Sequence, residues 1–175
     1  WKPVTVEYRP VSRIVDPYTY THALYADNAV AHLYTTLKIE TEADRLTDFR
    51  VVVEGRCGES VFRTEHKPYC ASLRIRTELS DPVLWWPKNY GEPNLYDVTV
   101  TLLYKGEVCD TVSYKLGIRH LWLKRTSQCG ENGDFCFIVN GERIFAMGTN
   151  WVPTDALPSR HDEYTLRDIM RADEL

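Results

Sequence analysis

The stretch LRIRTEL at residues 73–79 places an apolar residue or Thr at every odd position and a charged residue at every even one. Successive side chains of a β-strand point to opposite faces, so this two-residue period predicts a strand with one buried and one solvated face. Residues 33–40 and 96–104 alternate in the same way. Strands that leave one face in water belong to antiparallel sheets.

Turn-forming residues separate these alternating stretches. Lys105-Gly106 permits a chain reversal after the third stretch, into another strand at 112–116. Shorter apolar runs predict three further strands, at 49–53, 60–63 and 118–123. Seven or eight short strands are typical of a two-sheet sandwich. We therefore expect an all-β fold, an antiparallel β-sandwich with little helix, from about Arg13 to Lys124.

The two-residue apolar period ends before residues 126–134. This stretch is polar and Gly-rich, which predicts a linker or long loop. Asn140-Gly141 between two apolar runs then predicts a β-hairpin with a type I′ turn, in which both central residues have positive φ. Further on, Asp162 is placed to cap a helix with one apolar face, made of Leu166, Ile169 and Met170. This strand, loop and helix indicate the opening unit of an α/β layer or barrel.

Composition limits the number of domains and the classes of partner. A chain of 175 residues, 43% of them hydrophobic, predicts one main domain with an appendage. The formal charge of −4 and scattered Lys and Arg argue against nucleic acid. No apolar run has the length of a membrane span, and the start at Trp1 shows neither an initiator Met nor a secretion signal. We expect a piece of a longer protein.

The five cysteines are an odd number without a CxxC pair, which implies neither a zinc site nor a complete disulfide framework. Small buried thiols are the simplest interpretation. Cys129 and Cys136 flank the Gly-rich turn and are the favoured pair if the protein resides in an oxidising compartment. The five histidines show no metal-ligand spacing, so we expect no metal and no cofactor.

Three segments follow one another in an informative order: WKPV at 1–4, LWWPKNYG at 84–91 with NLY at 94–96, and VNGERIF at 139–145 continuing to GTNWVPTD at 148–155. Together they resemble glycoside hydrolase family 2 in its β-mannosidase-like form. The first is similar to the end of the family's jelly-roll domain, and the second to the motif that leads into the later strands of its immunoglobulin-like sandwich. The third resembles the hairpin and first strand of its catalytic TIM barrel.

This resemblance implies a division of the chain. Residues 1–12 would end a jelly-roll sugar-binding domain, 13–124 would form the immunoglobulin-like sandwich, and 125–175 would begin the (β/α)8 barrel. The parent enzyme would hydrolyse terminal β-glycosides with retention, β-mannosides above all. Trp151 and Val152 stand where the β-galactosidase and β-glucuronidase forms usually carry His or Arg, and those two activities remain alternatives.

Retaining hydrolysis needs two carboxylates about 5–5.5 Å apart, one as nucleophile and one as acid/base. The family supplies both as Glu residues from later barrel strands, the acid/base directly after an Asn. This sequence contains no Asn-Glu dipeptide. We therefore expect no catalytic residue within the 175 residues and no hydrolytic activity of this piece alone.

Three residues after the expected barrel strand are candidates for binding the substrate, because such groups collect at the C-terminal ends of barrel strands. Asn150 can hydrogen-bond sugar hydroxyls, and the ring of Trp151 can stack on a pyranose or merely pack between strand and loop. Asp155 is a further candidate, with a turn-forming or capping role as the alternative.

Trp85 and Trp86 lie between Pro82 and Pro87, which suggests that one indole plugs an end of the sandwich while the other meets the barrel or a neighbouring domain. A sugar platform on the sandwich is the less favoured use of this pair. An autonomous carbohydrate-binding module would need an exposed aromatic strip, whereas the wet strand faces carry mostly Arg, Glu and Thr. An adhesion-type immunoglobulin domain would need a Cys pair around a Trp, and the spacing here does not provide it.

The linker interpretation is therefore preferred over both alternatives. It predicts carbohydrate as the substrate of the parent enzyme and contacts with the jelly-roll and barrel domains, and it predicts no nucleic-acid or membrane partner. A periplasmic, extracellular or lysosomal parent would suit this chemistry.

Overall fold

The structure, a computed structural model, describes residues 4–6, 8–125, 135–148, 150, 152, 157, 160 and 162–172. The chain forms two compact units, residues 9–146 and residues 1–8 with 147–175. Each unit is considered by itself.

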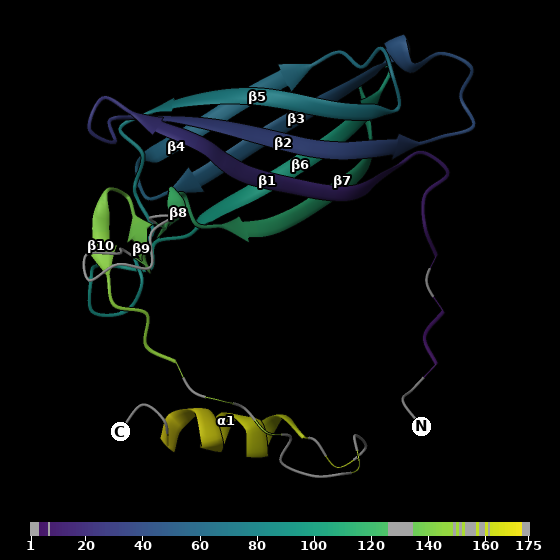
Figure 1. Cartoon of the computed structure of the whole chain (residues 1–175). Helices are drawn as coiled ribbons and strands as arrows, with labels where there is room; N and C mark the ends of the chain where they lie inside the picture. Colours follow the sequence, from purple (N-terminus) through teal and green to yellow (C-terminus); the bar gives the residue numbers. More distant parts are fainter. Residues whose placement is uncertain are drawn as a thin grey trace. The chain divides into compact units, whose positions relative to one another are not determined.

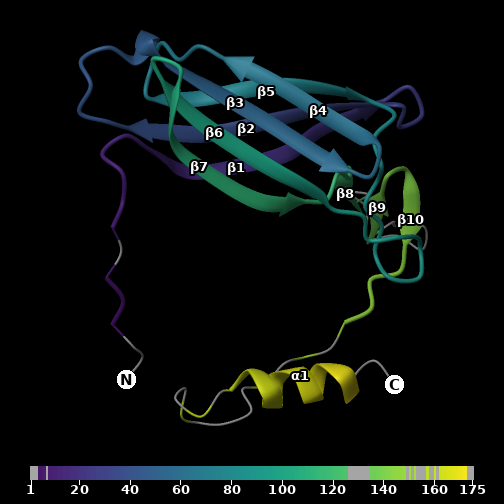
Figure 2. The same cartoon turned by 180° about the vertical axis from the view of Figure 1, so that it is seen from behind.

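The larger unit contains a sandwich of two antiparallel sheets (Figures 1 and 2). One sheet has three strands in the order β1-β2-β5: β1 (Arg13–Tyr25), β2 (Val30–Glu40) and β5 (Ser72–Ser80). The other has four in the order β4-β3-β6-β7: β3 (Phe49–Cys57), β4 (Ser60–His66), β6 (Tyr96–Tyr104) and β7 (Glu107–Leu116). Between Arg13 and Lys124 the one helical segment is a single 3-10 turn, η1 (Leu46–Asp48). The expected sandwich with little helix is confirmed.

The core lies between the two sheets, as the two-residue period predicts. In β5 the odd positions 73–79 are buried and the even positions are exposed. From the facing sheet Phe49, Tyr96 and Val100 are fully buried, and the ring centroid of Phe49 lies 4.8 Å from that of Tyr104. Burial of these apolar surfaces is the main stabilising contribution to the sandwich.

A polar contact also joins the two sheets. The hydroxyl of Tyr114 in β7 lies 2.6 Å from the hydroxyl of Thr19 in β1, which lies 2.8 Å from the hydroxyl of Thr35 in β2. Burial raises the pKa of Tyr114, because the phenolate is less well solvated there than in water. The three hydroxyls therefore satisfy one another inside a mostly apolar interface.

Strand β1 was not expected from the sequence. Its pairing with β2 shifts register between Val15 and Tyr18 and again between Thr21 and Ala23, and Pro17 lies in the first irregularity. Each shift moves the following side chains to the other face and so breaks the two-residue period. The two-residue period of β1 is therefore not visible in the sequence, and the strand is defined by its pairing with β2.

A third sheet lies at one end of the sandwich (Figure 1). This end sheet has the order β10-β9-β8 and consists of β8 (Leu121–Arg125), β9 (Phe135–Val139) and β10 (Glu142–Ile144). The expected hairpin is confirmed, with φ of 51° at Asn140 and 92° at Gly141. The sandwich strand expected at 118–123 is wrong in its pairing, because β8 bonds to β9 and not to a sandwich strand.

The smaller unit contains helix α1 (Glu163–Ala172). Asp162 caps it as expected, since its Oδ1 accepts a hydrogen bond of 2.8 Å from the Thr165 amide and its Oδ2 one of 3.0 Å from the Thr165 hydroxyl. The Thr165 amide lowers the pKa of Asp162, because it stabilises the carboxylate form. Leu166 and Met170 are exposed and Ile169 is half-buried, so the apolar face of the helix is largely open.

Candidate functional site

Of the three candidate substrate-binding residues, the structure describes Asn150, which belongs to the smaller unit. Asn150 is exposed and lies outside any helix or strand. Trp151 and Asp155 lie outside the described residues. Their role in sugar binding therefore stays a prediction.

The best-defined polar site is a junction centred on Asn140, whose side chain is buried. Its Oδ1 accepts a hydrogen bond of 2.9 Å from the His120 amide, and its Nδ2 donates one of 3.1 Å to the Trp85 carbonyl. Its own amide donates to the His120 carbonyl at 2.8 Å, and its carbonyl accepts from Asn28 Nδ2 at 3.1 Å. Every polar group of Asn140 has a partner, and these partners come from three distant segments.

This Asn140 junction fixes the end sheet to the sandwich. Asn28 lies in the turn between β1 and β2, Trp85 lies between β5 and β6, and His120 immediately precedes β8. Buried hydrogen bonds contribute modestly when made, but leaving a buried donor or acceptor unpaired costs about 1–3 kcal/mol. These bonds thereby hold the hairpin turn in one orientation relative to the β1–β2 turn and the β5–β6 loop.

Trp85 packs at the end of the sandwich next to this junction. Its amide donates to the Ile118 carbonyl at 2.9 Å, and the guanidinium carbon of Arg119 lies 4.6 Å from the centre of its ring. A Cβ added at Gly117 would lie 2.9 Å from the indole, so only Gly permits this close approach. Trp85 thus packs against the segment that follows β7 and is half-buried, and its expected role as a plug at an end of the sandwich stays a prediction.

Trp86 packs against its own loop, where Gly91 allows the same kind of close approach, since a Cβ added at Gly91 would lie 2.8 Å from the indole. The amide of Trp86 donates to the Glu92 carbonyl at 3.0 Å. A contact between Trp86 and a neighbouring domain stays a prediction.

The end sheet exposes an apolar side. Residues paired across β8 and β9 share a face, and the four exposed apolar residues on this face are Leu121, Leu123, Phe135 and Phe137. Beside them lies a hollow of about 600 Å³ whose lining includes Tyr90, Ile144 and Phe145. The Tyr90 hydroxyl accepts a hydrogen bond of 2.8 Å from the Phe145 amide, which holds the chain after β10 at the rim. We call this surface the end-sheet apolar face.

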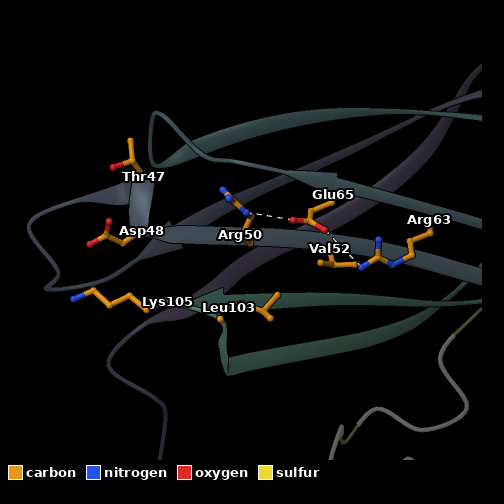
Figure 3. Close-up of a pocket in the computed structure, with 9 residues that line it drawn as sticks. Thr47, Asp48, Arg50, Val52, Arg63, Glu65, Leu103 and Lys105 are labelled. Atoms are coloured by element: carbon orange, nitrogen blue, oxygen red, sulfur yellow. Dashed lines mark ion pairs between the residues drawn. The ribbon is translucent and has the colours of Figure 1, made fainter.

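A second hollow, of about 390 Å³, lies on the outer face of the four-stranded sheet. Figure 3 shows its charged side chains, with Glu65 between Arg50 and Arg63. Glu65 lies 3.3 Å from Arg50 and 3.7 Å from Arg63, and Arg63 also contacts Glu54 at 2.9 Å. These charges largely neutralise one another, and because the side chains are exposed, solvent screens each ion pair.

Other chemical features of the described residues are few. Within those residues, no group of three or more His, Cys, Asp or Glu side chains is arranged to hold a metal ion. Cys136 is a buried free thiol, while its expected partner Cys129 lies outside the described residues, and their conditional pairing stays a prediction. In the part of the chain that the structure describes, no helix combines the length and apolar character of a membrane span.

Sequence reasoning identified Asn140 only as a turn residue and missed its role in the junction. The turn requires positive φ, and Asn is one of the residues that adopt it readily. The partners of its side chain and carbonyl are 20, 55 and 112 positions away. No local pattern could have indicated these contacts.

Comparisons with known proteins agree with this architecture. The model of the family described as "Glycosyl hydrolases family 2" matches residues 12–119. A "Beta-mannosidase B" of Aspergillus terreus is 30% identical over 159 residues, which cover 90% of this chain and 18% of the relative. One of Thermothelomyces thermophilus is 31% identical over 162 residues, covering 89% and 18%. The chain thus spans about a fifth of the length of these relatives.

Solved structures show the same relationship. The β-D-mannosidase of Dictyoglomus thermophilum superposes with a TM-score of 0.76 at 28% identity, over 96% of this chain and 21% of that one. An exo-chitosanase of Amycolatopsis orientalis matches with a TM-score of 0.65 at 18% identity, over 92% and 18%, and supports the fold alone. The immunoglobulin-like sandwich and the sequence matches lead to one conclusion: the chain belongs to glycosyl hydrolase family 2.

Proposed function

We propose that this chain supplies the non-catalytic immunoglobulin-like domain of a β-mannosidase, together with the beginning of its catalytic barrel. In this proposal residues 1–12 end a jelly-roll domain, 13–124 form the sandwich and 125–175 open the barrel. The domain holds the jelly roll and the barrel in a fixed relation. The names of the relatives at 30–31% identity support the mannoside specificity.

The observation that carries this proposal is the end-sheet apolar face, attached to the sandwich through the Asn140 junction. Leu121 and Phe135 are 50% and 74% exposed, which is unusual for large apolar residues in one cluster. Covering a large apolar side chain contributes roughly 1.5–3 kcal/mol. In this division β9 and β10 belong to the opening of the barrel, and the later part of the barrel would gain this energy by packing on the face, while the junction would fix the angle at which it packs.

Catalysis itself would come from two carboxylates on later barrel strands, one as nucleophile and one as acid/base. Among the residues present here, Asn150, Trp151 and Asp155 would line the substrate side of the barrel. Asn150 would bond sugar hydroxyls, Trp151 would stack on the pyranose ring and Asp155 would accept a hydrogen bond from it.

Two measurements test the proposal that this chain is non-catalytic and that its end sheet docks the catalytic barrel. The purified chain, incubated with aryl β-mannoside and aryl β-galactoside, should release no more phenol than buffer does. Turnover that survives repurification would contradict the absence of catalytic residues.

The second measurement replaces the equivalent segment of the Dictyoglomus thermophilum enzyme with this chain and follows aryl β-mannoside hydrolysis. Leu123→Asp or Phe137→Asp in this chimaera should lower activity and thermal stability, because a charge would be buried at the barrel contact. Val108→Asp is the matched control, since Val108 is 62% exposed on β7. Equal activity of all three variants would contradict the docking role.

The same chimaera tests the substrate residues. Asn150→Ala, Trp151→Ala and Asp155→Asn should each lower kcat/KM for the aryl β-mannoside while leaving the melting temperature unchanged. Unaltered kcat/KM in all three variants would remove these residues from the substrate side.

A further inference from the structure

The outer face of the β1-β2-β5 sheet carries a row of aromatic side chains. The strand period places Tyr18, Tyr20 and Tyr34 on the side opposite the buried Thr19 and Thr35. Tyr20 pairs directly with Tyr34 across β1 and β2. Tyr18 is 63% exposed, so the row begins in open solvent. We call this surface the tyrosine face.

The rings form one continuous series. The centroids of Tyr18 and Tyr20 are 5.9 Å apart with 22° between the ring planes, and those of Tyr20 and Tyr34 are 6.0 Å apart at 30°. His22 meets Tyr34 edge-on at 5.2 Å. Centroid spacings near 6 Å lie within the range of attractive aromatic pairs, so each ring is in contact with its neighbour.

Hydrogen-bonding groups line this row on the β5 side. The guanidinium carbon of Arg74 lies 4.1 Å from the centre of the Tyr34 ring, which fixes the cation against the aromatic surface. Arg76 contacts both His32, at 3.2 Å, and Glu78, at 3.3 Å. Arg74, Arg76 and Glu78 are exposed, so their remaining donors and acceptors face solvent next to the rings.

The composition of the tyrosine face distinguishes it from the end-sheet apolar face. The outward positions of β5, and those of β2 between His32 and Lys38, hold no aliphatic side chain. The end-sheet apolar face, by contrast, exposes Leu and Phe side chains such as Leu121 and Phe137. Flat rings with polar tips, beside fixed donors and acceptors of both charges, instead match a ligand that has apolar C–H faces and hydroxyl edges.

We propose that the tyrosine face binds an extended, neutral β-linked glycan chain. The C–H faces of successive sugars would pack on Tyr18 and Tyr20, and their hydroxyls would bond to Arg74 and Arg76. Membership of a glycosidase family supports glycan chains as the ligand class for this protein. The proposal concerns the sandwich alone and does not depend on the docking role of the end sheet.

The test uses the whole chain and soluble β-1,4-linked mannohexaose and cellohexaose, followed by NMR titration and calorimetry. Binding of at least one hexasaccharide should shift amides of β1, β2 and β5 and leave those of β8 and β9 unmoved. Tyr18→Ala and Tyr20→Ala should each weaken binding roughly tenfold or more. Tyr69→Ala is the matched control, because Tyr69 is a 77% exposed tyrosine between β4 and β5, and it should bind as the wild type does.

Each contrary result has a definite meaning. Absence of amide shifts with either hexasaccharide at millimolar concentration would overturn the proposal, as would equal affinity of the Tyr18→Ala and Tyr69→Ala proteins. A dimer that Tyr18→Ala dissociates, without glycan binding, would assign the face to contact between copies and likewise overturn it. Loss of activity in the chimaera described above would leave this result unaffected, so the two proposals fail separately.

Discussion

The sandwich and the end sheet are both antiparallel, but they are stabilised in different ways. The two sheets of the sandwich bury their apolar side chains against each other, with residues such as Phe49 and Val100 fully covered. The end sheet leaves Leu121 and Phe135 exposed and is joined to the sandwich through hydrogen bonds of Asn140. The sandwich is therefore stabilised mainly by its own core, whereas the end sheet leaves part of its apolar surface exposed to solvent.

The two type I′ turns show the same contrast on a smaller scale. Lys105 and Gly106 have φ of 51° and 94°, and Asn140 and Gly141 have 51° and 92°. The backbones are therefore alike. The ammonium of Lys105 rests 5.0 Å from the centre of the Tyr104 ring, whereas the Asn140 side chain is buried between three segments. The Lys105 side chain contacts only the residue beside its turn, whereas the Asn140 side chain links the end sheet to the sandwich.

The largest effect is expected in the core of the sandwich. Phe49→Ala should lower the free energy of unfolding by about 3–5 kcal/mol, because it removes a fully buried ring and leaves a cavity. Urea denaturation of the chain measures this change. A loss below about 1 kcal/mol would show that the sandwich does not depend on its core in the way described.

The second prediction concerns the junction. Asn140→Gly keeps the positive φ but leaves the His120 amide and the Trp85 carbonyl without their hydrogen-bond partner. We expect the free energy of unfolding to fall by about 2–3 kcal/mol. Lys105→Gly, at the matching position of the other turn, should change stability by less than about 0.5 kcal/mol. Equal effects of the two substitutions in thermal unfolding would remove the distinction between the turns.

The sequence predicted the strands whose period is regular and missed features that depend on distant contacts. The alternation at 73–79 was sufficient to place β5 with its buried face, and Asn140-Gly141 was sufficient to place the hairpin. Pro17 and two register shifts concealed β1. The pairing of β8 with β9 could not be read locally, because a strand does not encode which sheet it joins.

The candidate sites show the same limit. The prolines that flank Trp85 and Trp86 indicated a restricted loop, but they did not indicate the hydrogen bond between Asn140 and the Trp85 carbonyl. The tyrosine face was underestimated, because its members come from β1, which was missed, as well as from β2 and β5. Only the register that sets Tyr20 opposite Tyr34 brings these side chains together.

A smaller effect is expected for the polar contact inside the sandwich. Tyr114→Phe should cost about 1 kcal/mol near neutral pH, because it removes the hydrogen bond to Thr19 while Thr35 still satisfies that hydroxyl. The raised pKa of Tyr114 means that folding opposes its ionisation. The wild type should therefore lose stability as the pH rises above about 10, and the variant should lose less. Identical pH profiles of the two proteins would contradict the burial of this hydroxyl.

The smallest effect is expected on the end-sheet apolar face. Phe135→Ala removes a ring that is 74% exposed, so the isolated chain should change in stability by less than about 0.5 kcal/mol. Comparison with Phe49→Ala, the same substitution in the sandwich, makes the contrast direct. A loss of more than about 2 kcal/mol on urea denaturation would show that this face is already covered within the chain.

The most direct test of the attachment of the end sheet is hydrogen exchange of the β8 and β9 amides, measured in the wild type and in Asn140→Gly. Amides that are hydrogen-bonded between these strands should be protected in the wild type. In the variant they should exchange much faster, while the amides of β2, β3 and β6 keep their protection. Unprotected β8 and β9 amides in the wild type, or unchanged protection in the variant, would contradict the account that Asn140 fixes this sheet to the sandwich.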